Sequence, residues 1–244
     1  MKDPDAPHAS HARRGPLHRG RRAPHLVVVG AGTGISQATG RRLGADGYAV
    51  GLVARREGPL AEIGSALRED GVRTEWATAD AGDPRSLTAA VESLTAALGP
   101  VGVLLYNVSV GRAAAVPDLA PEDLLGDLAA GAVGLQTAVR AVLPGMRERG
   151  TGTVLVTGGG SADRPIPSMA SLGVQKAALR ALVDVQAKAL APEGIHVATV
   201  TVRGLVGEDE QIHPDRVAAV YAELVAETAG PQETWRTVVE LKAH

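Results

Sequence analysis

A chain of 244 residues with 45% hydrophobic residues is long enough to bury the core of one large α/β domain. Its formal net charge of −2 gives no reason to expect nucleic acid or an anionic membrane as a partner. The absence of cysteine excludes disulfides, zinc–thiolate sites and a cysteine nucleophile. No apolar stretch reaches membrane-spanning length and no signal peptide is evident, so we expect a cytoplasmic protein.

The first 24 residues differ in composition from the rest of the chain. They hold five arginines, three histidines and four prolines but hardly any large apolar residue. Such a segment cannot bury enough surface to offset the entropy of ordering. We therefore predict a disordered basic tail over residues 1–24 and one domain over residues 25–244. An arm that binds a polyanion is the alternative interpretation of the tail.

From residue 25 onward, apolar segments of strand length alternate with longer amphipathic segments. This alternation is typical of a parallel sheet covered by helices on both faces. We predict a doubly wound, Rossmann-like α/β fold of about seven strands, with ligands beyond the carboxyl ends of the strands. The predicted strands are 26–29, 49–54, 72–78, 101–106, 152–157, 196–202 and 235–241, and the predicted helices are 35–46, 59–70, 84–98, 121–149, 168–190 and 214–227.

The first predicted strand leads into a glycine-rich turn. Gly30, Gly32 and Gly34 stand at alternate positions, and a predicted helix begins at Ile35. Glycine lets the backbone approach a pyrophosphate, and the free N–H groups at the start of a helix favour its negative charge. A purely structural connection can use the same residues, so this turn alone leaves both interpretations open.

The motifs that follow make the chain resemble the short-chain dehydrogenase/reductase family from residue 25 nearly to the C-terminus. The family motif TGxxxGxG corresponds to residues 29–36, where valine replaces the threonine and Ser36 replaces the last glycine. An aspartate and a hydrophobic residue beside the adenine correspond to Asp80 and Ala81. The family motif NNAG corresponds to residues 106–109, which read YNVS. The resemblance implies a dinucleotide cofactor.

Arg55 follows the second predicted strand, where family members that use NAD carry an acidic residue. An arginine offers a fork of donors to a 2′-phosphate, which a carboxylate would repel. The resemblance therefore implies NADP(H), whereas the alternative is that Arg55 and Arg56 only make the surface soluble. The residues expected to bind the cofactor are Gly30, Gly32, Thr33, Gly34, Ile35, Arg55, Asp80, Ala81, Asn107 and Lys176.

The catalytic side chains of the family are largely missing. The lysine of its YxxxK motif is Lys176, but the tyrosine position holds Leu172, which cannot transfer a proton. The serine position falls on Gly159, with Ser161 two residues later, and the asparagine position falls on Gly131. These substitutions fall at positions that the family uses around the nicotinamide, whereas the positions used around the adenosine largely match the family motifs. Lys176 and Ser161 are the expected catalytic groups.

Three functions remain open. The preferred one is a repurposed enzyme of the dehydratase, isomerase or cyclase type that acts on a small organic molecule, with NADP(H) structural or vestigial. The second is an atypical NADPH-dependent carbonyl reductase, because hydride transfer chiefly needs cofactor and substrate in register. The third is a catalytically dead binding or assembly partner. Ser109 and Asp163 are further candidate polar groups.

Assembly and access to the site are also suggested by the sequence. The predicted helices 121–149 and 168–190 are apolar around more of their circumference than one buried stripe requires. The corresponding helices of the resembling family pair across a two-fold axis, which implies a homodimer or homotetramer. The family's substrate lid corresponds to residues 205–213, a short acidic segment that predicts either an open pocket or one completed by another subunit or by the tail. The seven histidines show no metal-ligand spacing, so no metal site is expected.

Overall fold

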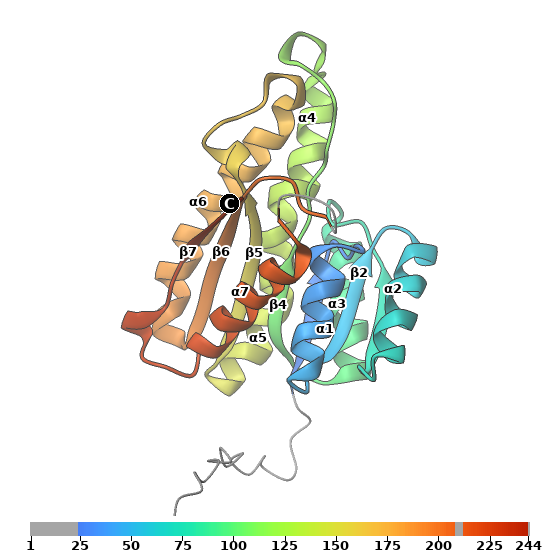
Figure 1. Ribbon diagram of the computed structural model, residues 1–244, viewed down its shortest axis with the longest axis vertical. Helices are drawn as coiled ribbons and strands as arrows, with labels where there is room; N and C mark the ends of the chain where they lie inside the picture. Colours follow the sequence, from blue (N-terminus) through green and yellow to red (C-terminus); the bar gives the residue numbers. More distant parts are fainter. Residues whose placement is uncertain (1–23, 208–211, 244) are drawn as a thin grey trace, which may run out of the picture.

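The computed structural model describes residues 24–207 and 212–243, which build one seven-stranded sheet with helices on both faces (Figure 1). The strand order is β3-β2-β1-β4-β5-β6-β7, and neighbouring strands pair in parallel. The predicted doubly wound fold is therefore confirmed. The strands are β1 (His25–Val29), β2 (Ala49–Ala54), β3 (Thr74–Thr78), β4 (Val101–Tyr106), β5 (Gly152–Gly159), β6 (Ile195–Arg203) and β7 (Val238–Lys242).

The helices are α1 (Ile35–Ala45), α2 (Glu57–Glu69), α3 (Pro84–Leu98), α4 (Pro121–Leu128), α5 (Gly134–Arg149), α6 (Ala170–Leu190) and α7 (Pro214–Glu227). Local signals set several of their ends. The Asp83 carboxylate accepts a hydrogen bond from the backbone N–H of Arg85 at 2.9 Å, and Pro84 begins α3. No helix in the described part of the chain combines the length and apolarity that crossing a membrane requires.

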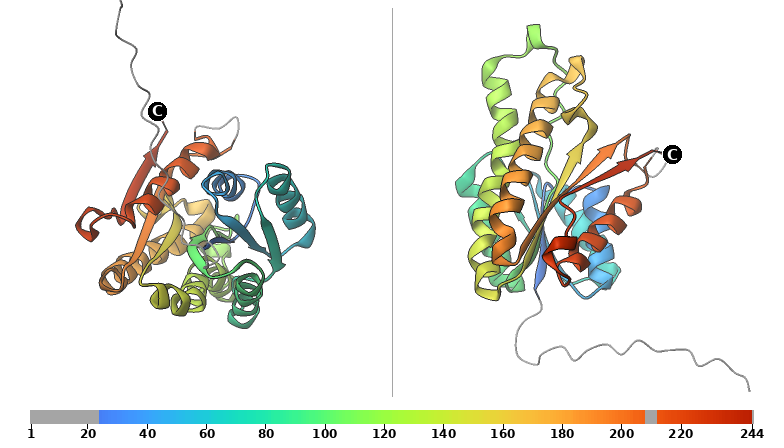
Figure 2. Two further views of the ribbon diagram at one scale, coloured as in Figure 1. Left: turned by 90° about the horizontal axis from the view of Figure 1, so that it is seen from below. Right: turned by 90° about the vertical axis from the view of Figure 1, so that its left-hand side faces the viewer.

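Strand β1 shows how the sheet joins two cores. Val27 and Val29 pack with residues of α3, α5 and α6, whereas Leu26 and Val28 pack with residues of α1, α2 and α7. Successive side chains of a strand point to opposite faces, so β1 must be apolar at each of these positions. Figure 2 shows the two helix layers on either side of the sheet.

The prediction of a single helix over residues 121–149 is wrong, because the structure has two helices in this range. A π-helical turn over Ala129–Val133 separates α4 from α5. The hydroxyl of Tyr106, at the end of β4, donates a hydrogen bond to the carbonyl oxygen of Ala130 within this turn. Gly134 allows the approach, because a Cβ atom there would collide with the Tyr106 hydroxyl. The turn thus depends on a contact between residues far apart in sequence, which helical periodicity does not reveal.

Residues 1–23 of the predicted tail and part of the predicted lid lie outside the described residues. Of the lid segment 205–213, positions 208–211 are outside. The flanks of this gap are joined, because the backbone N–H of Ile212 donates to the carbonyl oxygen of Leu205 at 3.1 Å and that of Gly207 donates to Ile212 at 3.2 Å. The two ends of the segment therefore lie side by side at the end of β6.

Candidate functional site

Two cavities lie at the carboxyl ends of the central strands and share Asn107 and Ser109 in their walls. The smaller, of about 230 Å³, is bounded by the segments that follow β1, β2, β3 and β4. The larger, of about 700 Å³, is bounded by the ends of β5 and β6 and the start of α6. This edge of a doubly wound sheet is where the fold places ligands.

The residues predicted to bind a cofactor line these two cavities or connect them. The smaller cavity is lined by Gly30, Arg55, Asp80, Ala81 and Asn107. The larger is lined by Ile35, Asn107 and Lys176. The turn that carries Gly32, Thr33 and Gly34 connects Ala31 in the smaller cavity to Ile35 in the larger.

The glycine turn fits a pyrophosphate. Gly30 has a φ of +84°, and a Cβ atom there would lie 2.8 Å from the backbone of Asn107, so only glycine suits this position. A Cβ atom at Gly32 or Gly34 would meet no atom within 4 Å, which leaves space above the turn. No side chain caps the N-terminus of α1, so its first N–H groups remain available to an anion.

Arg55 and Arg56 give the smaller cavity a positive rim. Both side chains are exposed, line the cavity and form no ion pair with any residue that the structure describes. Asp80 also lines the cavity, and its carboxylate accepts a hydrogen bond from the backbone N–H of Gly82 at 2.8 Å. Asp80 therefore caps a turn and also contributes to the cavity wall.

Lys176 is the buried cation of the larger cavity. The residue is 7% exposed, and its Nζ atom donates hydrogen bonds to the carbonyl oxygens of Thr157 at 2.9 Å and Val108 at 3.2 Å. Burial disfavours the charged form and lowers the pKa of Lys176 to about 8. An ammonium has three N–H donors, so one donor remains for a ligand.

Three of the other positions assigned to catalysis border the same cavity. Leu172 lies one turn before Lys176 on α6, Gly159 is the last residue of β5, and Ser161 lies two residues further on. A Cβ atom at Gly159 would have Lys176 Cγ and Ser161 Oγ at 3.6 Å as its nearest neighbours, which is ordinary contact. The structure thus brings the predicted positions together and leaves room for a serine at Gly159.

A chain of buried hydroxyl and amide groups fixes Asn107. Its Nδ2 atom donates to Ser36 Oγ at 2.8 Å, and its Oδ1 atom accepts from Thr157 Oγ1 at 2.6 Å. Thr157 Oγ1 also lies 2.8 Å from the hydroxyl of Tyr221 on α7. Because Thr157 gives its one hydrogen to Asn107, the Tyr221 hydroxyl donates to Thr157. Neither Tyr221 nor Ser36 is predicted from the sequence to take part in this chain of hydrogen bonds.

Gln175 occupies the space beside the missing asparagine. A Cβ atom at Gly131 would lie 2.5 Å from Gln175 Cδ, so no larger residue fits there while Gln175 keeps this position. The Gln175 side chain is fully buried and bonds both backbone groups of Val110: Oε1 accepts from N–H at 2.9 Å and Nε2 donates to C=O at 3.1 Å. A glutamine inside a helix gives no sequence signal for this role, so sequence reasoning missed it.

Residues 107–115, which we call the β4 strap, are held against α4 and α6 at alternate positions. Arg112 makes a two-pronged ion pair with the buried Asp127 at 2.9 and 3.0 Å, and this guanidinium lowers the pKa of Asp127 below its ordinary value. The odd-numbered residue Ser109 is exposed and lines both cavities. The strap is therefore a fixed wall, and its bonds run from Val108 to Lys176, Val110 to Gln175, Arg112 to Asp127 and Ala114 to Ala170.

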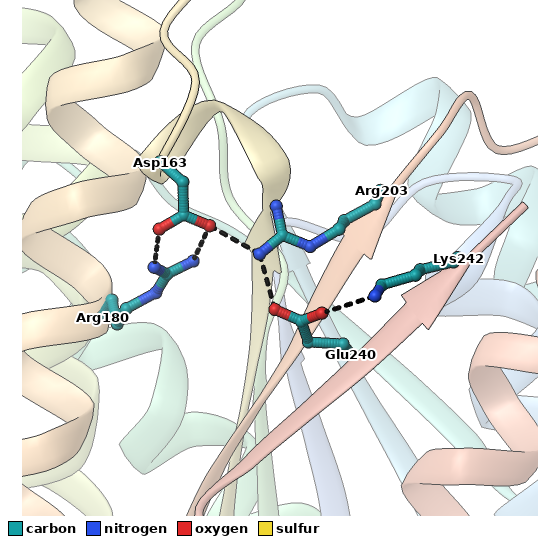
Figure 3. A network of polar contacts seen from close by, with 5 residues as sticks. All are labelled: Asp163, Arg180, Arg203, Glu240 and Lys242. Carbon is teal, nitrogen blue, oxygen red and sulfur yellow. Dashed lines mark hydrogen bonds and ion pairs between the residues drawn. The ribbon is translucent and has the colours of Figure 1, made fainter.

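Asp163, a candidate polar group, is held in an ion-pair network (Figure 3). It pairs with Arg180 of α6 and, at 2.6 Å, with Arg203 at the end of β6. These two guanidinium groups lower the pKa of Asp163 to about 2. Arg203 also contacts Glu240 of β7 at 2.5 Å, and Glu240 contacts Lys242 at 3.4 Å. Asp163 stays ionised at neutral pH, so it is unsuited to donate a proton.

Comparison with known proteins identifies the family. Residues 24–207 match the family model for short chain dehydrogenase. A 2,3-dihydro-2,3-dihydroxybenzoate dehydrogenase of Bacillus subtilis is 26% identical over 151 residues, which are 62% of this chain and 58% of that enzyme. The match therefore spans less than two thirds of this relative's length.

Solved structures share the whole fold. A metagenomic short-chain oxidoreductase in complex with NADP has a TM-score of 0.80 at 23% identity, covering 90% of this chain and 97% of that chain. An NADPH-bound short-chain oxidoreductase of Pseudomonas aeruginosa PAO1, described as containing an atypical catalytic center, has a TM-score of 0.78 at 23% identity, covering 90% and 95%. With most of its length matched by the family model, the chain belongs to the short-chain dehydrogenase family.

Proposed function

We propose that this protein is an NADPH-dependent reductase of carbonyl compounds that works without the family's tyrosine. The observation that carries the proposal is the cavity of about 700 Å³ beside Lys176, which continues into the smaller cavity at Asn107 and Ser109. An inert protein has no need of this space, and a non-redox enzyme has no need of a substrate cavity that is continuous with the one beside the glycine turn. The open cavity therefore favours the reductase over the repurposed enzyme that the missing side chains alone suggest.

The cofactor in this proposal is NADP(H), which lies across both cavities. The glycine turn and the start of α1 bind the pyrophosphate, and Arg55 pairs with the 2′-phosphate. Asp80 and Ala81 border the adenine, while Asn107 and Lys176 border the nicotinamide half. The names of the NADP- and NADPH-bound structural relatives support this choice of cofactor. When bound, NADPH supplies a hydride to a carbonyl carbon.

The carbonyl oxygen must gain a proton as the carbon gains hydride. Leu172 supplies none, but Lys176 and Ser161 are polar side chains in the wall of the same cavity. The Lys176 ammonium has one N–H left and a pKa of about 8, so it can release a proton to the oxygen, directly or through a water, near neutral pH. Ser161 donates a hydrogen bond that polarises the carbonyl. Consumption of NADPH by the purified protein with a panel of ketones and aldehydes, together with recovery of the alcohols, tests this proposal.

Changing Arg55 to aspartate should exchange the cofactor preference. The carboxylate repels a 2′-phosphate and accepts hydrogen bonds from ribose hydroxyls, so the ratio of Kd values should shift toward NADH by about tenfold or more. Fluorescence titration with NADPH and NADH measures the ratio. Arg85→Asp is the matched control, because Arg85 is exposed on α3 and lines neither cavity. An unchanged ratio in Arg55→Asp would show that Arg55 does not contact the 2′-phosphate.

We also propose that the protein assembles as a homodimer or homotetramer through α4, α5 and α6. Val174 and Val185 are 46% and 64% exposed on α6, and their spacing of eleven residues, three helical turns, puts them on one face. Leu125 on α4 and Val133 in the π-helical turn are 66% and 55% exposed. Light scattering should give twice or four times the mass of 24.9 kDa. Val185→Asp should lower that mass, and a monomeric wild type would contradict the assembly.

A further inference from the structure

Arg164 stands where the larger cavity meets a third one. This polar groove, of about 610 Å³, runs beside the ends of β6 and β7 and is lined by Asp163, Arg164, Arg203, Glu240, Lys242 and Ala243. Arg164 and Arg203 line both spaces. The groove lining carries three cations and two carboxylates, a net charge of one positive.

The other charges of the groove are satisfied by one another (Figure 3). Asp163 is held by Arg180 and Arg203, and Glu240 is held by Arg203 and Lys242. The side chain of Arg164 makes no hydrogen bond or ion pair with any residue in the described ranges, although Asp163 precedes it in the chain. Arg164 is therefore the one cation of the groove lining that no carboxylate of the described residues pairs.

Apolar side chains stand next to Arg164 on the side of the larger cavity. Ile166 is 46% exposed and Leu205 is 65% exposed, and both line the cavity together with Met169 and Leu172. Large apolar side chains that remain exposed around a concave space mark a surface that an apolar ligand covers. A ligand that satisfies both features has an apolar body and a negatively charged end.

We propose that the substrate is a carbonyl compound with an apolar body and a carboxylate, and that Arg164 binds the carboxylate at the mouth of the larger cavity. The planar guanidinium matches a carboxylate with two parallel N–H···O bonds. The apolar body then packs on Ile166, Met169 and Leu172, with the carbonyl toward Lys176. The inference that the substrate has a carbonyl group rests on the proposed reductase function. The inference that it has a carboxylate rests on Arg164 alone. The acidic residues Glu208, Asp209 and Glu210 lie outside the described residues, and the charges counted for the groove do not include them.

Binding of two matched probes tests the proposal without turnover. Phenylbutanoate and phenylbutanamide share an apolar body but differ in charge, and isothermal titration gives their Kd values for the full chain with and without saturating NADP. We expect the acid to bind wild type about tenfold more tightly than the amide. Arg164→Gln should abolish this difference and leave the amide unchanged. Arg85→Gln should preserve it, because Arg85 is exposed on α3 and lines none of the three cavities.

Equal binding of the two probes to wild type would overturn the proposal, as would an Arg164→Gln protein that keeps the preference for the acid. Absence of binding by both probes also contradicts it. The reductase function is judged separately, by consumption of NADPH. A protein that binds the acid through Arg164 but reduces no carbonyl compound would refute the reductase and retain the carboxylate site.

Discussion

The double variant Leu172→Tyr/Gly159→Ser should reduce a simple ketone about 10²–10⁴ times faster than wild type at saturating NADPH, the range that a positioned general acid contributes. Leu172 lies one turn before Lys176 in the wall of the larger cavity, so a tyrosine there comes beside a buried ammonium that favours its ionised form. Gly159 has room for a serine, because the nearest atoms to its Cβ would be 3.6 Å away. The serine then orients the carbonyl oxygen that the tyrosine protonates.

The matched control is Leu172→Phe/Gly159→Ser, which has the same ring and lacks only the hydroxyl. If the tyrosine variant is no faster than the phenylalanine variant, the missing proton donor does not limit the wild-type rate. The wild-type pH profile gives a second readout. Because the pKa of Lys176 is lowered to about 8, its ammonium is lost as pH rises through that value, and the rate should fall above pH about 8. A rate that keeps rising across this range would exclude Lys176 as the proton source.

Changing Gly131 to asparagine should lower the free energy of unfolding by about 1–3 kcal/mol, the usual cost of overpacking a buried site. The new Cβ atom would lie 2.5 Å from Gln175 Cδ, and the glutamine cannot move away without leaving both backbone groups of Val110 unpaired. Urea unfolding measures the loss. Gly126→Asn is the matched control, because Gly126 is an exposed helical glycine with nothing within 4 Å of its Cβ position.

The pair Gly131→Asn/Gln175→Ala separates this steric conflict from a general loss of helix stability. Truncation of Gln175 removes the clash and leaves space into which the asparagine amide can reach toward Val110. The double variant should therefore lose less stability than the sum of the single variants, with a coupling energy of about 0.5–3 kcal/mol. Additive losses would show that Gly131 and Gln175 are independent, and that the glutamine does not account for the glycine.

The fold could be predicted closely from local sequence because its strands are apolar and buried on both faces. The predicted bounds of β2, β4, α3 and α7 match the structure, and a buried run such as β4 tolerates no other assignment. The last strand shows the limit of this reasoning. We expect it to begin at Trp235, but that ring stacks on His196 with a centroid distance of 5.0 Å and β7 begins at Val238. An aromatic residue favours a strand in either case, and only tertiary contacts separate the two outcomes.

The site could be predicted where it depends on backbone conformation and charge. The backbone freedom of Gly30 and the positive charge of Arg55 can be recognised from the residue type alone, and both residues line the smaller cavity. Gln175 and Tyr221 carry no such signal. Each acts through a partner on another element, Val110 or Thr157, and these pairings exist only once the chain is folded. The same holds for Arg164, whose lack of a partner becomes visible when Asp163 is seen to bind Arg180 and Arg203.

The most direct test of the reductase is transfer of deuterium from NADPH that carries two deuterium atoms at the nicotinamide C4 position. Wild-type protein is incubated with the labelled cofactor and a ketone that carries an apolar body and a carboxylate, and the alcohol is examined by mass spectrometry. We predict one deuterium on the carbinol carbon of the alcohol that wild type forms. Lys176→Met should form no labelled alcohol, and Leu172→Tyr/Gly159→Ser should form it faster than wild type. An unlabelled product, or NADPH that binds without any alcohol forming across the panel of carbonyl compounds, would contradict the proposed function.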